Sequence, residues 1–220
     1  MSLFGAMQGL RTAQATGAGI DPVVDLSFEL SGEVLPHDYP AALERAILSE
    51  LPEVADDPVF GIHRIRAPLT QAGYVLSRRA RLQLRVSSSR VATFEALGGL
   101  TINVGGAALS IGRPVIRPVT AFPTLRAQMV VNRFDDEQAF MDDVGMQLEV
   151  LEVKGEAMCG KPAELEGAEG MLRGFALVMH GLSMADSLRL QVVGLGAGRR
   201  LGCGLFVHHK VIDSPDASPE

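Results

Sequence analysis

The sequence predicts an α+β fold made of two β-α-β-β-α-β units in tandem. Segments in which apolar and polar residues alternate are interleaved with segments in which apolar residues recur at helical spacing. The same order of strand-like and helix-like segments occurs twice, and the stretch RPVTAFPT, at residues 117–124, separates the two occurrences. The 220 residues are enough for two domains of about 100 residues each.

The first unit begins with VVDLSFELSG (23–32), whose alternation predicts a half-buried strand. PHDYPAALERAILSELP follows, in which Asp38 can cap a helix of about three turns with apolar residues at helical spacing. VFGIHRIR (59–66) and YVLSRRARLQLRVS (74–87) predict two strands with arginines at alternating positions. A short helix at 89–99, a strand, a Gly-Gly turn and another strand complete the unit.

The second unit repeats this order from Thr124 onward. TLRAQMVVNRF predicts a strand and DDEQAFMDDVGMQLEVL an amphipathic helix with acidic residues at its start. EAMCGKPAELEGAEGMLRGFALVMHGL predicts two strands around a polar, glycine-rich loop. Ser183 can cap a helix over SMADSLRLQVVG, and LGCGLFVHHKV predicts the closing strand.

Two such units indicate two tandem ferredoxin-like (RRM-like) domains. The expected organisation is a flexible N-terminal segment at 1–22, an N-terminal domain at 23–120, a C-terminal domain at 121–212 and a disordered tail at 213–220.

The formal net charge of −6 conceals an uneven distribution of charge. Residues 1–60 hold two basic and ten acidic side chains, and residues 134–220 hold seven and fifteen. Residues 61–133 carry eleven arginines and one acid, Glu95, for a net charge of +10. The planar arginine fork suits phosphates and stacks on bases, so this block predicts a polyanionic partner. Pairing of these arginines with the acidic flanks inside the fold is the structural alternative.

The sequence offers no signal for a membrane or a metal. No apolar run approaches the roughly 20 residues that span a bilayer, and the N-terminus does not resemble a signal peptide. We therefore expect a cytoplasmic protein without a membrane partner. Cys159 and Cys203 form no C-x-x-C pair, and the adjacent His208 and His209 would point apart on a strand. Neither a metal site nor a cofactor is predicted.

A glycine-rich stretch, VVGLGAGRRLGCGLFVHHK at 192–210, lies between the last predicted helix and the last predicted strand. It has no G-x-x-x-x-G-K-S/T motif, and its glycines follow a helix instead of preceding one, which excludes a nucleotide-phosphate loop. Dense glycines let backbone amides approach a ligand while arginines supply charge, so an RNA-holding loop and a flexible turn are both compatible with the stretch. The residues that would hold RNA are Gly194, Gly196, Arg199, Arg200, Gly202 and Gly204.

The pattern G-x-G-x5-G-x-G before an apolar strand resembles the CRISPR-associated repeat-RNA processing endoribonucleases of the RAMP superfamily. GLGAGRRLGCGLFV carries the pattern, and LPHDY, GIHRIR and SMADSLRLQ resemble further segments of that family. The resemblance covers residues 23–211. It implies cleavage of CRISPR precursor RNA within each repeat, without a metal, to leave 2′,3′-cyclic phosphate and 5′-OH ends. The partners it implies are the repeat RNA and other subunits of a CRISPR effector complex.

Such a reaction needs a base, an acid and positive charge near the phosphate. Histidine suits either proton-transfer role because its pKa lies near neutrality. The resemblance points to His63 as the catalytic residue, whereas His37 and Tyr39 are candidates for the second proton-transfer group or for orienting the ribose. A strand histidine held within the sheet is the structural alternative for His63. No lysine lies nearby, which leaves the general acid open. The arginines expected to bind RNA here are Arg64, Arg66, Arg78 and Arg79.

Three functions remain open at this point. The first is the processing endoribonuclease, and the second is a non-catalytic RNA-binding subunit of a CRISPR ribonucleoprotein complex with the same fold. The third is an unrelated ferredoxin-like protein that binds a small anion. Fold alone does not separate them, because one fold hosts many functions.

Overall fold

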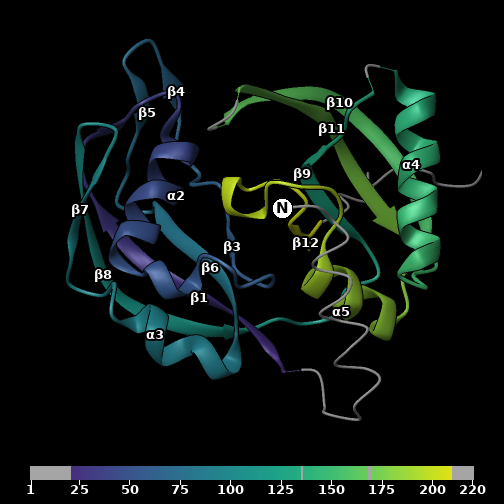
Figure 1. Cartoon of the computed structure of the whole chain (residues 1–220), viewed down its shortest axis with the longest axis horizontal. Coiled ribbons are helices and arrows are strands. Elements are labelled where there is room, and N and C mark those ends of the chain that lie inside the picture. Colours follow the sequence, from purple (N-terminus) through teal and green to yellow (C-terminus); the bar gives the residue numbers. More distant parts are fainter. Residues whose placement is uncertain (1–20, 135, 168–169, 210–220) are drawn as a thin grey trace, which may run out of the picture.

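The computed structural model describes residues 21–134, 136–167 and 170–209, and Figure 1 shows how their helices and strands are arranged. The described part is a mixed α+β structure with a five-stranded, a four-stranded and a small three-stranded sheet, all antiparallel. This confirms the predicted α+β class. The predicted flexible segment 1–22 lies outside the described residues except for its last two residues, and the predicted tail 213–220 lies wholly outside them.

The N-terminal half, residues 21–118, contains the five-stranded sheet in the order β3-β6-β1-β8-β7. Its elements are β1 (Val23–Ser31), β2 (Val34–Leu35), α2 (Tyr39–Glu50), a 3₁₀ turn (Pro52–Val54), β3 (Gly61–Ile62), β4 (Leu69–Thr70), β5 (Gly73–Val75), β6 (Arg81–Ser87), a 3₁₀ turn (Ser88–Arg90), α3 (Val91–Glu95), β7 (Thr101–Val104) and β8 (Ala107–Pro118). One face of the sheet and the helices enclose a core in which Leu26, Phe28, Ile47 and Phe94 are fully buried.

Two predicted strands of this half are shorter than expected. The strand predicted over 59–66 is limited to β3, and the strand predicted over 74–87 is split into β5 and β6. A turn closed by the hydrogen bond from the Ala80 amide to the Ser77 carbonyl separates the two pieces. Beyond that turn, β5 pairs with β2 and β4 in the small sheet. Alternating sequence pattern cannot distinguish one long strand from two strands in different sheets.

The first helix begins at the predicted residue but without the predicted cap. Asp38 occupies the N-cap position of α2, yet its side chain makes no capping hydrogen bond. An N-cap side chain usually bonds the amide of the second or third helical residue. The second residue here is Pro40, which has no N–H, and the amide of Ala41 already bonds the backbone carbonyl of Asp38 at 3.2 Å.

The C-terminal half, residues 125–209, contains the four-stranded sheet in the order β10-β11-β9-β12. Its elements are β9 (Leu125–Val131), α4 (Glu137–Val150), β10 (Glu156–Gly167), β11 (Gly170–His180), α5 (Met184–Val193), a 3₁₀ turn (Arg199–Leu201) and β12 (Phe206–His208). Asp136 caps α4 by accepting a hydrogen bond from the Ala139 amide, and Ser183 caps α5 as predicted, by accepting one from the Asp186 amide.

The two halves meet along the glycine-rich stretch that precedes β12. In Figure 1 this stretch, coloured yellow, lies between α2 of the N-terminal half and β9 of the C-terminal half. A small apolar cluster spans the boundary; it consists of Ala41, Met129, Leu165, Leu201 and Cys203. We call this boundary, where residues 59–65 and 193–206 lie against each other, the seam.

Candidate functional site at the seam

The glycine-rich stretch packs closely against the strand that leads to His63. At Gly202, φ is 82°, and a Cβ atom would lie 2.6 Å from Cγ of Arg64. At Gly61, on the opposite side of the contact, a Cβ atom would lie 2.7 Å from Cδ2 of Leu205. Gly202 requires glycine because its φ is left-handed and backbone atoms of the facing segment lie within 3.3 Å of the added Cβ, whereas at Gly61 a side chain would have to displace the end of the Leu205 side chain.

The backbone amides of four glycines in this stretch donate to acceptors within the protein. The distances are 2.8 Å from Gly194 to the Leu190 carbonyl, 3.0 Å from Gly196 to Oε1 of Gln147, 3.1 Å from Gly202 to the Arg199 carbonyl and 2.7 Å from Gly204 to the Met129 carbonyl. This differs from the expectation that these amides face RNA. Since each amide has one proton, its bond within the fold leaves none for a phosphate.

The two arginines of the stretch also bind the N-terminal half. Arg199 donates from Nη1 to the Val193 carbonyl at 2.6 Å and from Nη2 to the Val59 carbonyl at 3.1 Å. Burial, together with the nearby charge of Arg85, lowers the pKa of Arg199 to about 9. Arg200 donates from Nε to Oε1 of Glu44 at 2.6 Å and from Nη1 to the Ala55 carbonyl. Both side chains were predicted to bind RNA, and in the structure their guanidinium groups bond acceptors of the N-terminal half.

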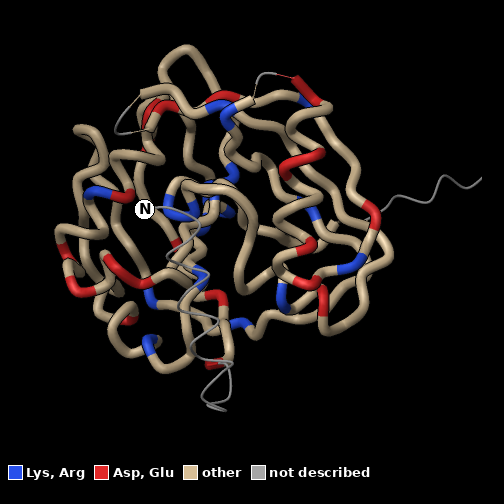
Figure 2. Tube along the Cα trace, turned by 45° about the vertical axis from the view of Figure 1, so that its right-hand side comes forward, with Lys and Arg blue, Asp and Glu red and all other residues tan. Residues whose placement is uncertain are grey.

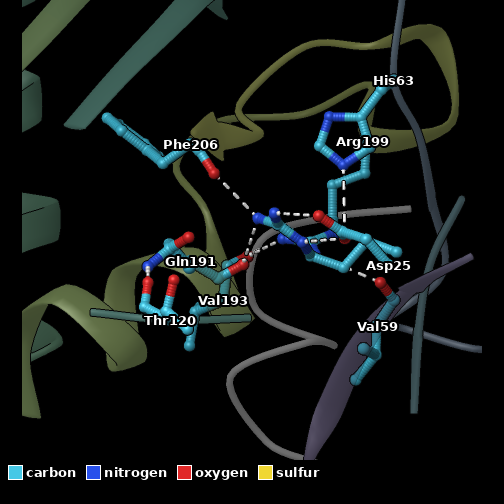
Figure 3. Close-up of polar contacts among 9 residues, drawn as sticks. Asp25, Val59, His63, Thr120, Gln191, Val193, Arg199 and Phe206 are labelled. Carbon is cyan, nitrogen blue, oxygen red and sulfur yellow. Dashed lines mark hydrogen bonds and ion pairs between the residues drawn. The ribbon is translucent and has the colours of Figure 1, made fainter. Parts of the chain in front are cut away.

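His63 lies inside the seam beside a buried ion pair (Figure 3). Its Nε2 atom is 3.6 Å from Oδ1 of Asp25, and only 10% of its side chain is exposed. The same carboxylate accepts hydrogen bonds from Nε of Arg85 at 2.8 Å and from Nη2 at 3.0 Å. Because 3.6 Å exceeds a hydrogen-bond distance, Nε2 is a buried polar atom without a hydrogen-bond partner among the described residues.

Burial shifts the protonation equilibria of this cluster. Burial lowers the pKa of His63, and the nearby charges of Arg85 and Arg199 lower it further, although interaction with Asp25 opposes the shift. Burial alone would raise the pKa of Asp25, but its interactions with His63 and Arg85 outweigh burial and hold that pKa well below its usual range. The cluster therefore favours an ionised Asp25 and a neutral His63.

Tyr39 is a buried residue that ties α2 to the segment after His63. Its hydroxyl group accepts a hydrogen bond from the Ile65 amide at 2.9 Å and donates one to the Ile65 carbonyl at 3.4 Å. Burial raises the pKa of Tyr39 to about 12. A tyrosine with both hydroxyl interactions occupied and a raised pKa is poorly suited to act as a base.

His37 is exposed, unlike His63 and Tyr39. It stands just before α2, and Ala41, one turn further along, belongs with Leu165 of β10 to the boundary cluster. The bonds between Tyr39 and Ile65 bring the chain that carries Arg64 and Arg66 alongside the same end of α2. This end of α2 therefore places an exposed histidine near the segment that carries Arg64 and Arg66.

The predicted RNA-binding arginines of the N-terminal half differ in exposure. Arg66, Arg78 and Arg79 are exposed, whereas Arg64 is half-buried and its Nη2 atom lies 3.6 Å from Sδ of Met129. Figure 2 shows several Lys and Arg positions following one another through the middle of the molecule, between its two halves. Part of the +10 block is thus internal, since Arg85 is 1% exposed, and part remains available to an anion.

The described residues offer neither a metal cluster nor a membrane span. Within residues 21–134, 136–167 and 170–209, no group of three or more His, Cys, Asp or Glu side chains is arranged to hold a metal ion. No helix in the described part of the chain is long and apolar enough to cross a membrane.

The fold and the seam define a class of α+β proteins in which a glycine-rich loop joins two antiparallel sheets with their helices. A protein-family model described as "Cas6 Crispr" matches residues 24–211. The chain is 31% identical over 185 residues to a protein of Myxococcus xanthus named CRISPR-associated endonuclease Cas6, covering 84% of this chain and 80% of the relative. The chain therefore belongs to the Cas6 family, which confirms the resemblance noted in the sequence.

Solved structures with low sequence identity share the fold. The structure of a Cas6-related gene product from Pyrococcus furiosus aligns with a TM-score of 0.59 at 14% identity and covers 87% of this chain and 99% of that chain. A structure described as "An RAMP protein binding different RNA substrates" aligns with a TM-score of 0.56 at 16% identity, covering 84% and 98%. At these identities the likeness concerns the fold alone.

Asp25 and Arg85, which contact the seam, are the residues of the candidate site that sequence reasoning missed. The register of β1 against β6 places them directly opposite each other. The sequence signal was several charged residues on the polar faces of two predicted strands, among them Asp25 and Glu29 in one and Arg81 and Arg85 in the other. Pairing them requires the strand register, which the alternating pattern does not specify.

Proposed function

We propose that this protein cleaves CRISPR precursor RNA within its repeats to release guide RNAs. The observation that carries the proposal is the 31% identity over 185 residues to a relative named as a CRISPR-associated endonuclease, together with a family match over residues 24–211, which include both halves and the seam. A neighbouring fold described as binding different RNA substrates and the exposed arginines of the N-terminal half support an RNA partner.

The two halves correspond, in this proposal, to two ferredoxin-like domains over residues 23–120 and 121–212. Strand order supports this: β3-β6-β1-β8 and β10-β11-β9-β12 both place the first and third strands of a β-α-β-β-α-β unit at the centre. β7 is then an additional strand at the edge of the first sheet.

The proposed reaction requires no metal. The 2′-oxygen at the cleavage site attacks the adjacent phosphorus, and the bond from phosphorus to the 5′-oxygen breaks. A base accepts the proton of the 2′-OH, and an acid gives a proton to the leaving 5′-oxygen. The products are a 2′,3′-cyclic phosphate and a 5′-OH, and no water is consumed.

Within this reaction we assign proton transfer to His37 in preference to His63. His37 is exposed where α2 begins, whereas Nε2 of His63 is buried against Asp25 and the pKa of His63 is lowered by burial. Arg64 and Arg66 supply positive charge to the phosphate, because the segment that carries them is bonded to the same end of α2 through Tyr39. Tyr39 holds this segment in place and transfers no proton.

RNA binding beyond the cleavage site is assigned to exposed arginines. Arg78 and Arg79 lie in the turn region between β5 and β6, and like Arg66 they are exposed to solvent. Arg199 and Arg200 contribute to the site indirectly, since their guanidinium groups bond the N-terminal half.

Incubation with the repeat RNA of its own locus in EDTA tests the proposal. We expect one cut per repeat, with a cyclic phosphate on the upstream product and a 5′-OH on the downstream product. Tight binding without a cut would instead favour the second function, a non-catalytic RNA-binding subunit of a CRISPR complex. Cutting that requires added Mg²⁺ would contradict the proposed chemistry.

A further inference from the structure

Arg85 is the largest fully buried side chain of the protein's described part, and it is charged. It projects from β6 on the face opposite the helix-covered core, directly across from Asp25 of β1. Its Nε and Nη2 atoms donate to the two carboxylate oxygens of Asp25 at 2.8 and 3.0 Å. This bidentate pair fixes the plane of the guanidinium group relative to the N-terminal sheet.

The remaining nitrogen of Arg85 reaches the other half of the molecule. Nη1 donates to the Phe206 carbonyl in β12 at 2.8 Å and to the Gln191 carbonyl in α5 at 3.1 Å. One planar guanidinium therefore connects the N-terminal sheet with a strand and a helix of the C-terminal half. Removing it leaves a half-buried carboxylate and two carbonyl groups without their donor.

The apolar contact between the halves is small by comparison. Each half has its own hydrophobic core, and the cluster that spans the boundary has five buried members. Apolar contacts are non-directional, so a cluster of this size resists separation of the halves more than rotation between them. Hydrogen bonds to a planar, buried group are directional, and they restrict rotation.

We propose that Arg85 is a positioning residue that sets the angle between the two halves and so preforms the proposed cleavage site beside the start of α2. Arg199, which belongs to the C-terminal half, donates a hydrogen bond to the Val59 carbonyl of the N-terminal half and restricts the same angle. The effect on catalysis rests on the proposed function; the effect on geometry does not. Through this angle, Arg85 determines how the Arg64 segment lies against Met129 of the C-terminal half.

The chain offers a matched control for Arg85. Arg81 lies on the same strand and the same sheet face, but it pairs with Glu29 at 3.2 Å and bonds the carbonyls of Arg78 and Ala80, all in the N-terminal half. Arg81→Gln therefore removes an arginine of β6 without touching the seam.

The test measures the distance between spin labels on the two halves, attached to cysteines at the exposed positions Ala92 and Glu149 in a Cys159→Ser background. We expect one narrow distance distribution for the labelled protein with Arg85 intact and for Arg81→Gln. In Arg85→Gln we expect the distance distribution to be broader or shifted. Arg85→Lys keeps the charge but not the planar fork, so it should broaden the distance distribution as well. If Arg85→Gln does not fold, Arg85→Lys takes its place in the test.

Cleavage kinetics provide the second readout. In Arg85→Gln we expect kcat to fall about 100-fold, as for reacting groups displaced by about 1 Å, with KM changed much less. The proposal would be overturned if both Arg85 variants gave distance distributions with the same width and the same mean as that of Arg81→Gln. If the protein cuts no RNA at all, the proposed function fails, and the distance measurement still decides the role of Arg85.

Discussion

The hydroxyl group of Tyr39 bonds both the amide and the carbonyl of Ile65, at 2.9 and 3.4 Å. A side chain thereby replaces a strand partner for a segment that leaves the main sheet after β3. The segment holds Arg64 and Arg66 beside the start of α2, where His37 is exposed. The geometry of the proposed site thus depends on a residue that does no chemistry.

Tyr39→Phe is expected to lower the free energy of unfolding by about 1–3 kcal/mol, because the buried Ile65 amide loses its acceptor. Urea unfolding measures this change. The control is Tyr74→Phe, in the only other tyrosine, whose ring packs edge-on against Tyr39 at 4.9 Å. Equal losses in the two variants would show that the hydroxyl bonds to Ile65 contribute nothing specific.

Gly202→Ala is expected to disturb the seam more than an alanine at another left-handed glycine. At Gly202 a Cβ atom would meet Arg64 at 2.6 Å, whereas at Gly106, where φ is 93°, it would meet nothing within 4 Å. Both alanines incur the left-handed backbone penalty of about 1–2 kcal/mol, and only Gly202→Ala adds a collision. Thermal unfolding compares them, and a Gly106→Ala variant at least as destabilised as Gly202→Ala contradicts close packing at the seam.

His63 makes stability depend on pH in a defined direction. Burial lowers its pKa below the usual 6.5, so the unfolded chain takes up a proton before the folded protein does as pH falls. The stability that the neutral imidazole contributes is present above pH 6.5 and is lost as pH falls through the lowered pKa. Asp25, whose pKa is held low, stays ionised in this window.

The free energy of unfolding should therefore decline below pH 6.5 by up to about 1.4 kcal/mol per pH unit through this group. Urea titrations at several pH values between 5 and 8 measure the slope, and His63→Gln should reduce it. His37→Gln, at an exposed position, serves as the matched substitution of a histidine outside the buried cluster. A slope that survives in His63→Gln would contradict the buried neutral state.

RNA binding should depend on exposed arginines of the small-sheet region. Replacing Arg66, Arg78 and Arg79 with alanine removes charges that bind phosphates, so affinity should fall at low salt. The slope of log affinity against log salt should decrease by about 0.7 for each phosphate of a single strand that is no longer neutralised. Fluorescence anisotropy at several salt concentrations measures both quantities.

The charge-matched control is Arg90→Ala. Arg90 directly precedes α3, which lies in Figure 1 at the end of the N-terminal half opposite β4 and β5. If Arg90→Ala lowers RNA affinity and the salt slope as much, for each charge removed, as alanine at Arg66, Arg78 and Arg79 does, binding follows total charge and the assigned surface is wrong.

The sequence pattern predicted the order of elements well, and strand ends less well. α5 begins where its predicted cap, Ser183, indicated, and α4 begins within the acidic stretch predicted at its start, where Asp136 is the cap; both accept amide hydrogen bonds within three residues, a local interaction. The division of 74–87 between two sheets depends on pairing with β2 and β4, which local pattern does not encode.

The candidate site could be predicted only in part. His37, Arg66, Arg78 and Arg79 were recognised as candidates, and their exposure keeps them so. The roles of buried charges could not be foreseen, since the acceptors of Arg85 lie 60, 106 and 121 residues away along the chain. A block of arginines predicts a polyanionic partner only when the arginines that bond other groups within the fold are left out of the count.

The assignment of proton transfer to His37 is tested most directly by comparing His37→Ala with His63→Ala in single-turnover cleavage of repeat RNA in EDTA, with RNA affinity measured alongside. We predict that His37→Ala binds RNA as tightly as the unsubstituted protein and cuts it at least about 100-fold more slowly, the usual loss for a proton-transfer group. Any decrease in the cleavage rate of His63→Ala should be accompanied by a decrease in its free energy of unfolding. Unchanged cleavage by His37→Ala would contradict the assignment.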